Sequence, residues 1–338
     1  KDLHWMAQWD WDYIISDECT RLSNIRNKQY RALRQLRPRH RLAMTGTPIQ
    51  NKPDDIFGIL DWKTPNSLGN YWKFINSFVV KNDKNWIIGY KNQEQLAALI
   101  APHMLRRLKS EILDLPKLII SDVAVELSPK ERKLYRQIKN DLLSDIEKSE
   151  INKVVRFSSL QLAIVKFGKL CEVCDSLELL GESKESSKLT ALRDLLSTLS
   201  DSNIVIFTRF SRMADILERE LNCLKITGAV QTAERSEIIN TFNNTTGAIL
   251  VGTRAISFGL NLQKASVIIN YDQSLSLAEH EQKISRAYRG GQTKNVLVYN
   301  LLCEKSIDKT IAKRLSEKQD MNALLLSDIK ALISEEPF

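Results

Sequence analysis

Residues 203–227 read NIVIFTRFSRMADILERELNCLKIT, and this stretch decides the fold. An apolar run at 204–207 predicts a buried strand, an amphipathic stretch at 213–221 predicts a helix, and residues 224–227 predict the next strand. A strand, a helix and a strand in this order are typical of a parallel sheet, because parallel neighbours need a long crossover that is usually helical.

The same alternation continues toward the C-terminus. Further helices are predicted at 235–242 and 278–287, and further strands at 248–252, 267–271 and 296–302. We therefore expect residues 200–338 to form an α/β unit with a doubly wound parallel sheet flanked by helices.

Two more apolar runs, at 11–16 (WDYIIS) and 41–44 (RLAM), suit buried strands of a smaller first unit. Helices are predicted at 54–62 and 96–112, and no clear pattern covers 66–94. Residues 118–127 alternate like a strand, and we expect the first unit to end at 127.

A helical region is predicted from 128 to 199. Ser128, Pro129 and Glu131 give its start signal, with serine as the cap, proline at the first position and glutamate at the third.

The composition is that of a globular protein. Of 338 residues, 43% are hydrophobic and 27% are charged, which excludes disordered and collagen-like classes. No apolar run approaches the ~18 residues that a membrane span needs. The net charge of +8 is compatible with a polyanionic partner but does not establish one. Nine cations and no acid lie between Cys19 and Pro53, and a solvated helix face is the favoured role for most of them.

Five scattered cysteines indicate a reducing compartment without a disulfide framework. Cys171 and Cys174 form a lone C-x-x-C. Zinc would need a second pair or nearby histidines, and the chain has only four histidines, so buried thiols are the favoured interpretation.

Polar side chains follow the two strands predicted near the N-terminus. Asp17 and Glu18 come directly after the first strand, and Thr45-Gly46-Thr47-Pro48 comes directly after the second. In nucleotide hydrolases a carboxylate at this place holds Mg²⁺, and a neighbouring one orients the attacking water. Taken alone, such an acid pair is more typical of helix capping.

Gln282, Arg286 and Arg289 are spaced by four and then three residues, so we expect them to share one helical face. Two guanidinium groups on one face favour a phosphate or carboxylate partner, a structural ion pair being the alternative. The stretch from Thr253 to Asn261 also follows a predicted strand.

Taken together, these segments resemble the Swi/Snf-type branch of the superfamily 2 helicase-like ATPases. They cover most of the chain in that family's order: WDYIISDECT (11–20), RLAMTGTPIQN (41–51), LRRLKSEILDLP (105–116), IVIFTRF (204–210), GTRAISFGLNLQKAS (252–266), QKISRAYRGGQ (282–292) and VLVYNLLCEKSIDKTIAKRLSEK (296–318).

The resemblance implies two RecA-like lobes that close on ATP over a double-stranded DNA groove. Residues 1–127 would be the C-terminal part of lobe one, 128–199 a helical connecting region, and 200–338 lobe two. DNA contacts are expected to go mainly to phosphates.

The resemblance also implies roles for individual residues. Asp17 would ligate Mg²⁺, Glu18 would polarise the attacking water, and Arg286 and Arg289 would be arginine fingers. The remaining site residues would bind the nucleotide (Gln282, Gly259) or couple it to DNA (Thr45, Thr47, Thr253, Arg254, Asn261, Arg106).

Three departures from the family pattern stand out. Thr20 replaces the usual histidine, and Gly290 replaces an aliphatic residue. The chain also contains no G-x-x-x-x-G-K-[ST] phosphate-binding loop. We expect that loop to have been lost with residues preceding Lys1, because both the acid pair and the arginine pair are intact.

Three functions remain open at this level. The favoured one is a DNA-dependent ATP hydrolase and translocase, inactive as this chain alone. The alternatives are a non-catalytic DNA-binding scaffold and a strand-separating helicase. The expected location is the cytoplasm or nucleoid of a prokaryote or phage, or the nucleus of a eukaryote.

Overall fold

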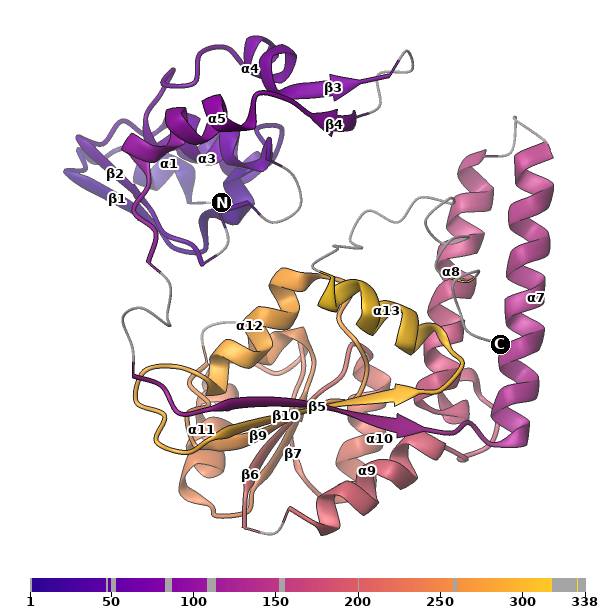
Figure 1. The fold of residues 1–338 in the computed structure, drawn as a ribbon. Coiled ribbons are helices and arrows are strands. Elements are labelled where there is room, and N and C mark those ends of the chain that lie inside the picture. The colour runs from indigo at the N-terminus through magenta and orange to yellow at the C-terminus, as the bar shows by residue number, and fades with distance from the viewer. Residues whose placement is uncertain are drawn as a thin grey trace. The chain divides into compact units, whose positions relative to one another are not determined.

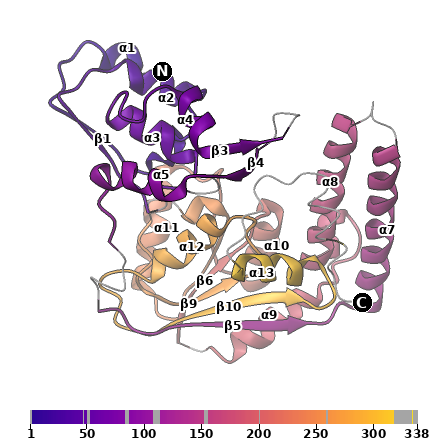
Figure 2. The same cartoon turned by 45° about the horizontal axis from the view of Figure 1, so that its top comes forward.

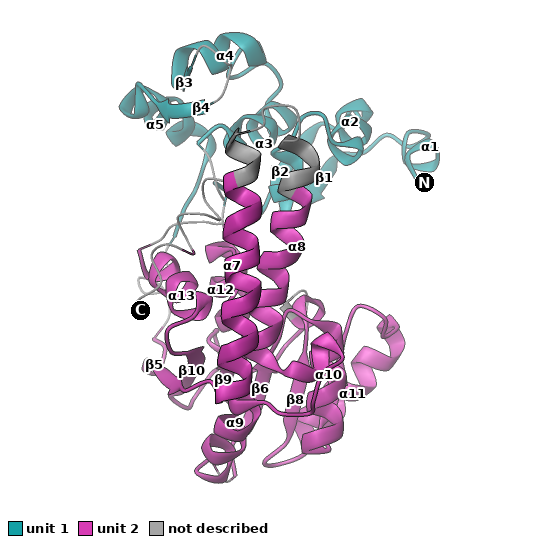
Figure 3. Ribbon diagram, turned by 90° about the vertical axis from the view of Figure 1, so that its right-hand side faces the viewer, with its two compact units in different colours: residues 1–111 teal, residues 112–338 magenta. Residues whose placement is uncertain are grey.

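The computed structural model describes residues 2–46, 48–49, 53–82, 87–107, 114–151, 156–199, 201–257, 260–317 and 333. The chain divides into two compact units, residues 1–111 and 112–338 (Figure 3). Each unit is described by itself. None of the described helices is both long and apolar enough to cross a membrane.

Unit 1 is built on a two-stranded parallel sheet of β1 (Tyr13–Ser16) and β2 (His40–Ala43), which confirms both predicted strands. The expectation that they are buried is wrong, because Ile14 alone among their residues is buried and their apolar side chains face both sides of the sheet. Its other described elements are α1 (Leu3–Met6), η1 (Cys19–Leu22), α2 (Lys28–Gln35), α3 (Asp55–Lys63), α4 (Tyr71–Phe78), β3 (Val79–Lys81), β4 (Ile87–Tyr90), α5 (Gln93–Ile100) and η2 (Ala101–His103).

The helix expected at 96–112 is shorter than predicted. The α-helix α5 ends at Ile100, a single 3-10 turn follows, and residues 104–107 are not helical. Pro102 accounts for the break, because proline has no N–H to donate within a helix and its ring clashes with the preceding turn. Residues 108–112 lie outside the described residues.

Helix α3 is the centre of unit 1. All its residues from Ile56 to Trp62 are buried, so it packs on every side. Gly58 permits this packing, since a Cβ at that position would lie 2.1 Å from the Leu22 carbonyl oxygen of η1.

Unit 2 contains a six-stranded parallel sheet in the order β5-β10-β9-β6-β8-β7 (Figure 1). Its strands are β5 (Leu118–Val125), β6 (Asn203–Phe207), β7 (Leu224–Ile226), β8 (Ile249–Gly252), β9 (Ala265–Asn270) and β10 (Val296–Cys303). The predicted α/β alternation is confirmed.

Helices cover both faces of this sheet, as buried parallel strands require. Side chains of α11 (Thr232–Asn244) and α12 (Leu277–Ala287) pack on one face. Those of α9 (Ser187–Ser197) and α10 (Ser211–Leu221) pack on the other. A 3-10 turn, η4 (Arg254–Ser257), follows β8.

Strand β5 lies in unit 2, although we expected residues 118–127 to close the first unit. It pairs with β10 along its whole length, from Leu118 opposite Val296 to Val125 opposite Cys303. The local alternation predicts a strand, but it carries no information about a partner far away in the sequence.

A helical hairpin of α7 (Pro129–Ile151) and α8 (Arg156–Asp175) projects from unit 2 (Figure 3), followed by η3 (Leu177–Leu180). The start signal works as predicted: the Ser128 N–H donates to Glu131 Oε2 at 2.8 Å, and the Glu131 N–H donates to Ser128 Oγ at 3.3 Å. Helix α13 (Ile307–Ser316) packs against α8 in the same core.

Candidate functional site

In unit 1, the register of the sheet brings the acid pair and the threonine loop together. Ser16 lies opposite Ala43, so Asp17 and Thr45 follow neighbouring strand ends. The Met44 N–H donates to the Ser16 carbonyl at 2.8 Å, and the Cys19 N–H donates to the Met44 carbonyl at 3.0 Å. These bonds fix the turn that carries the carboxylates beside the end of β2.

Glu18 has an unusual backbone conformation next to Asp17. Glu18 has φ 48° and ψ 49°, the left-handed conformation, which few non-glycine residues adopt. Its N–H donates to Asp17 Oδ1 at 2.9 Å. Both side chains are exposed and border a cavity of about 330 Å³ that Arg21 and Gln29 also line. Exposed carboxylates at a strand end suit Mg²⁺, which prefers oxygen ligands and retains water.

Cys19, next to the acid pair, is buried in the core of unit 1. Burial raises the pKa of this thiol to about 11. It therefore remains protonated near neutral pH and acts as a packing residue rather than a nucleophile.

In unit 2, the stretch from Thr253 to Asn261 connects opposite ends of the sheet. Thr253 follows the carboxyl end of β8 and caps η4, its Oγ1 accepting from the Ala255 N–H at 3.5 Å. Asn261 is exposed and lies before the start of β9, where its side-chain amide donates to Gln263 Oε1 at 3.2 Å. The two residues are thus brought to different ends of the sheet.

The arginine pair lies at the Asn261 end. The Leu262 N–H donates to the Arg286 carbonyl at 3.3 Å, which joins the loop before β9 to the end of α12. Gln282 and Arg286 share α12, as predicted. Arg289 does not, because α12 ends at Ala287. Arg289 sits in a following turn whose Gly291 has φ +92°. The expectation of one common helical face is therefore wrong for Arg289.

Sequence reasoning missed the glutamines that hold this turn. The buried Gln292 side-chain amide donates to the carbonyls of Gln263, Ala265 and Ala287, at 3.0, 3.0 and 3.2 Å. Gln263 Nε2 in turn donates to the Gly290 carbonyl. Gln263 and Gln292 lie in turns between helices and strands, and nothing in the sequence there signals contacts with backbone carbonyls.

Asp272 is a further residue that sequence reasoning missed. It follows β9 and is buried, and it accepts from Thr208 Oγ1 at 2.6 Å and from the Arg209 N–H at 2.8 Å. The Arg209 guanidinium lies 3.7 Å from the same carboxylate. Burial lowers the pKa of Arg209, but neighbouring groups outweigh this and hold it above its usual range. An acid directly after an apolar strand was the available signal, as for Asp17.

The other predicted site residues are partly described. Arg254 and Arg106 are exposed, Arg254 on η4 and Arg106 after η2. Thr47 and Gly259 lie outside the described residues.

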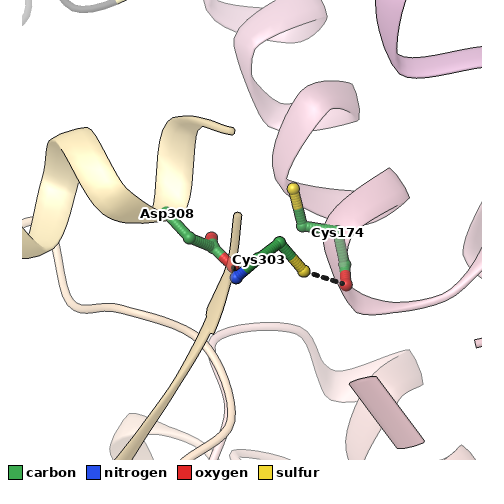
Figure 4. Close-up of side chains that lie close together, drawn as sticks. All are labelled: Cys174, Cys303 and Asp308. Carbon is green, nitrogen blue, oxygen red and sulfur yellow. Dashed lines mark hydrogen bonds between the residues drawn. The ribbon is translucent and has the colours of Figure 1, made fainter. Parts of the chain in front are cut away.

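The C-x-x-C pair is part of the core rather than of this site. Cys174 lies near Cys303 and Asp308, all three buried (Figure 4). Asp308 already accepts from Lys188 Nζ at 2.6 Å, and burial raises the pKa of the Cys174 thiol well above its usual value. Zinc needs thiolates and usually four ligands, so the three side chains fit a packed core better than a metal centre.

Comparisons with known families agree with this architecture. The SNF2-related domain matches residues 1–176, more than half of the chain, and the helicase conserved C-terminal domain matches residues 187–291. Together these two matches define a class of helicase-like proteins with a RecA-like α/β core. The chain belongs to the SNF2-related family.

Relatives and solved structures extend the match over nearly the whole chain. An uncharacterized ATP-dependent helicase of Mycoplasma genitalium is 30% identical, covering 99% of this chain but 33% of the relative. Protein CHROMATIN REMODELING 4 of Arabidopsis thaliana is 29% identical, covering 94% of this chain and 15% of the relative. The Sulfolobus solfataricus SWI2/SNF2 ATPase core in complex with dsDNA is 28% identical, with a TM-score of 0.53, covering 97% of this chain and 71% of that one. The chain therefore spans a third or less of these curated relatives.

Proposed function

We propose that this chain is part of an ATP-dependent double-stranded DNA translocase, in which ATP hydrolysis is coupled to closure of two lobes. The observation that carries the proposal is the sheet register of unit 1, which sets Asp17 and Glu18 beside Thr45 at one strand end. Family membership and the likeness to a DNA-bound SWI2/SNF2 core support it.

The acid pair would divide two tasks. Asp17 would hold Mg²⁺, which supplies charge neutralisation of the phosphates when bound. Glu18 would orient the attacking water and accept its proton. Both side chains are exposed and border one cavity, which supports this division because a metal ion and a water molecule could each reach a carboxylate.

Arg286 and Arg289 would stabilise charge on the transferred phosphoryl group. The Gln292 and Gln263 bonds fix the turn that carries Arg289, so little ordering is left for the transition state. Gln282 on α12 and the segment around Gly259 would contact the nucleotide. Since the acids and the arginines lie in different units, turnover would depend on closure.

DNA would be held mainly through its phosphates. Thr253 and the exposed Arg254, at the carboxyl end of β8, and the exposed Arg106 are the candidate contacts. Thr45, Thr47 and Asn261 would transmit the state of the nucleotide to these positions.

Hydrolysis also requires a phosphate-binding loop, and these 338 residues contain none. We propose that the active protein supplies it next to β1 and β2. The exposed apolar side chains of these strands, and of Met44 directly after β2, support that place: Tyr13 is 62% exposed, Ile15 56%, Leu42 44% and Met44 42%. Parallel sheets are normally covered on both faces.

The test is ATP hydrolysis by the natural protein that contains this chain, with and without duplex DNA. We expect duplex to stimulate turnover. The substitution Glu18→Gln should leave ATP binding intact and lower kcat by about 10²-fold or more. Hydrolysis that ignores duplex, or normal turnover in the variant, would refute the proposal. ATP binding without hydrolysis in the wild-type protein would support the scaffold alternative.

A further inference from the structure

Unit 2 has a cavity that none of the residues assigned a role above lines. It has a volume of about 540 Å³ and is lined by side chains of β5, β10, α12 and α13. Four of its eleven lining residues are apolar: Ile120, Leu302, Ala312 and Leu315. The polar lining residues are Asp122, Gln273, His280, Asn300, Lys309, Lys313 and Ser316.

Buried polar atoms at this cavity lack partners within the described part of the chain. Gln273 is 2% exposed, and its side-chain nitrogen donates no hydrogen bond there. The Nδ1 atom of His280 and, next in sequence to Gln273, the hydroxyl of Ser274 are in the same position. Native proteins rarely leave buried polar atoms unsatisfied, so the atoms of Gln273 and His280, which both line the cavity, indicate a missing polar ligand.

The other groups facing the cavity define the charge of that ligand. Asp122 accepts from Asn300 Nδ2 at 2.9 Å, and Lys309 lies 2.6 Å from Glu304. Burial and the neighbouring Lys283 lower the pKa of His280 to about 4, so it is neutral at pH 7. Lys313, in the last turn of α13, adds a positive charge to the lining that also includes Gln273. An acidic group suits this end of the cavity.

The cavity opens beside an unprotected sheet edge. Strand β5 is eight residues long and pairs with β10 on one side only, at the margin of the described sheet (Figure 2). Residues 119–122 are exposed, with Ile119 at 43% and Ile120 at 51%. Proteins usually protect such edges with short strands, prolines, bulges or charged side chains, above all lysine. The β5 sequence LIISDVAV has one charged residue, Asp122, and no proline or lysine.

We propose that the free edge of β5 and this cavity together bind an extended acidic peptide segment of a protein partner. Its backbone adds a strand next to β5, and one carboxylate side chain enters the cavity toward Lys313 and Gln273. Strand addition supplies affinity through main-chain hydrogen bonds, while a pocket for alternate side chains supplies specificity. Ile120 belongs to both features, which is why they form one site.

Other occupants fit less well. A lone inorganic anion would leave the apolar lining of Ile120, Leu302 and Leu315 uncovered. A nucleic-acid backbone has no alternating N–H and C=O groups, so it could not pair with the edge of β5.

The test uses the 338-residue chain and a fluorescein-labelled peptide of alternating valine and threonine with one central glutamate. Fluorescence anisotropy should show saturable binding, weakened at least about tenfold, or ~1.4 kcal/mol, when glutamine replaces the glutamate. Lys313→Glu should weaken binding by a similar factor. Ile120→Lys should abolish it, because a lysine blocks the edge. Lys133→Glu, an exposed site on α7 with the same charge change, serves as the control and should bind normally.

Circular dichroism of each variant shows whether the fold is retained, and Ile120 and Lys133 are exposed enough for this to be expected. Unchanged peptide binding in Lys313→Glu and Ile120→Lys would overturn the proposal. So would complete competition by inorganic phosphate, which would reduce the site to an anion cavity. A dimer in sedimentation that Ile120→Lys dissociates would instead assign the edge to a second copy of this chain.

Discussion

The two units bury their parallel strands to very different degrees. In unit 2 every strand residue of β6 and β9 is buried, between helices on both faces. In unit 1, β1 alternates: Ile14 is 8% exposed and its neighbour Ile15 is 56% exposed. Among the described residues, the sheet of unit 2 thus lies between two layers of helices, whereas the sheet that carries the acid pair is covered on one face only.

This difference separates stability from chemistry. The arginine turn rests on a finished scaffold held by buried polar contacts. The carboxylates rest on two short strands, which are marginal on their own. We infer that the acid pair of unit 1 depends on further structure more strongly than the arginine turn of unit 2 does. The following experiments test this comparison.

The largest effect on stability is expected from Lys188→Met in unit 2. Lys188 is fully buried and lies 3.0 Å from Asp175 and 2.6 Å from Asp308, both buried. Removing the cation leaves two buried carboxylates without a counter-ion, which should lower the free energy of unfolding by about 3–5 kcal/mol. Urea unfolding followed by circular dichroism measures it.

The pH dependence of this variant provides the check. Burial already raises the pKa of Asp175, so acidification should protonate this carboxylate once its cation is gone. The variant should therefore lose less unfolding free energy near pH 5 than near pH 8. As a control, Lys133→Met at an exposed position of α7 should change the free energy of unfolding by less than about 0.5 kcal/mol. A Lys188→Met protein as stable as the wild type would show that the buried network does not hold unit 2 together.

The next effect compares the two neighbouring isoleucines of β1. Ile14→Ala should destabilise unit 1 by about 2–4 kcal/mol, because it opens a cavity in the core formed with Leu22 and Trp62. Ile15→Ala removes an exposed side chain and should cost less than about 0.5 kcal/mol. All six tryptophans lie within residues 1–111, so their fluorescence reports unit 1 alone. Equal costs at the two positions would mean that both faces of the sheet are covered.

The smallest effect concerns His280 in unit 2. Its folded pKa of about 4 lies below the ordinary value of 6.5, because burial and Lys283 disfavour the charged ring. Its stabilising contribution is therefore complete above pH 6.5 and is lost as the pH falls toward 4, by about 1 kcal/mol per pH unit. His280→Gln should lack this part of the acid dependence. Parallel stability curves for the two proteins between pH 7 and pH 4 would contradict the burial.

Much of the fold could be predicted because the information is local. Apolar runs and helical periodicity identify nine strands and helices of unit 2, and the strand ends locate Asp17, Glu18 and Thr253. The pairing of β5 with β10 joins residues 178 apart, which no local pattern encodes. Likewise, the spacing predicts that Arg289 shares a helical face with Arg286, but α12 ends at Ala287, before Arg289. In the turn that follows, Gly291 adopts a positive φ. The contacts of Gln292 go to backbone carbonyls, and sequence patterns do not report those.

The central claim is that carboxylates of unit 1 and arginines of unit 2 act on the same phosphoryl transfer. The most direct measurement is kcat for ATP hydrolysis by the natural protein carrying Glu18→Gln, Arg289→Ala or both. We predict that each single change lowers kcat by roughly 10²-fold or more, and that the double change is little worse than the more damaging single one. Losses that multiply in the double variant, or an Arg289→Ala protein with normal turnover, would contradict it.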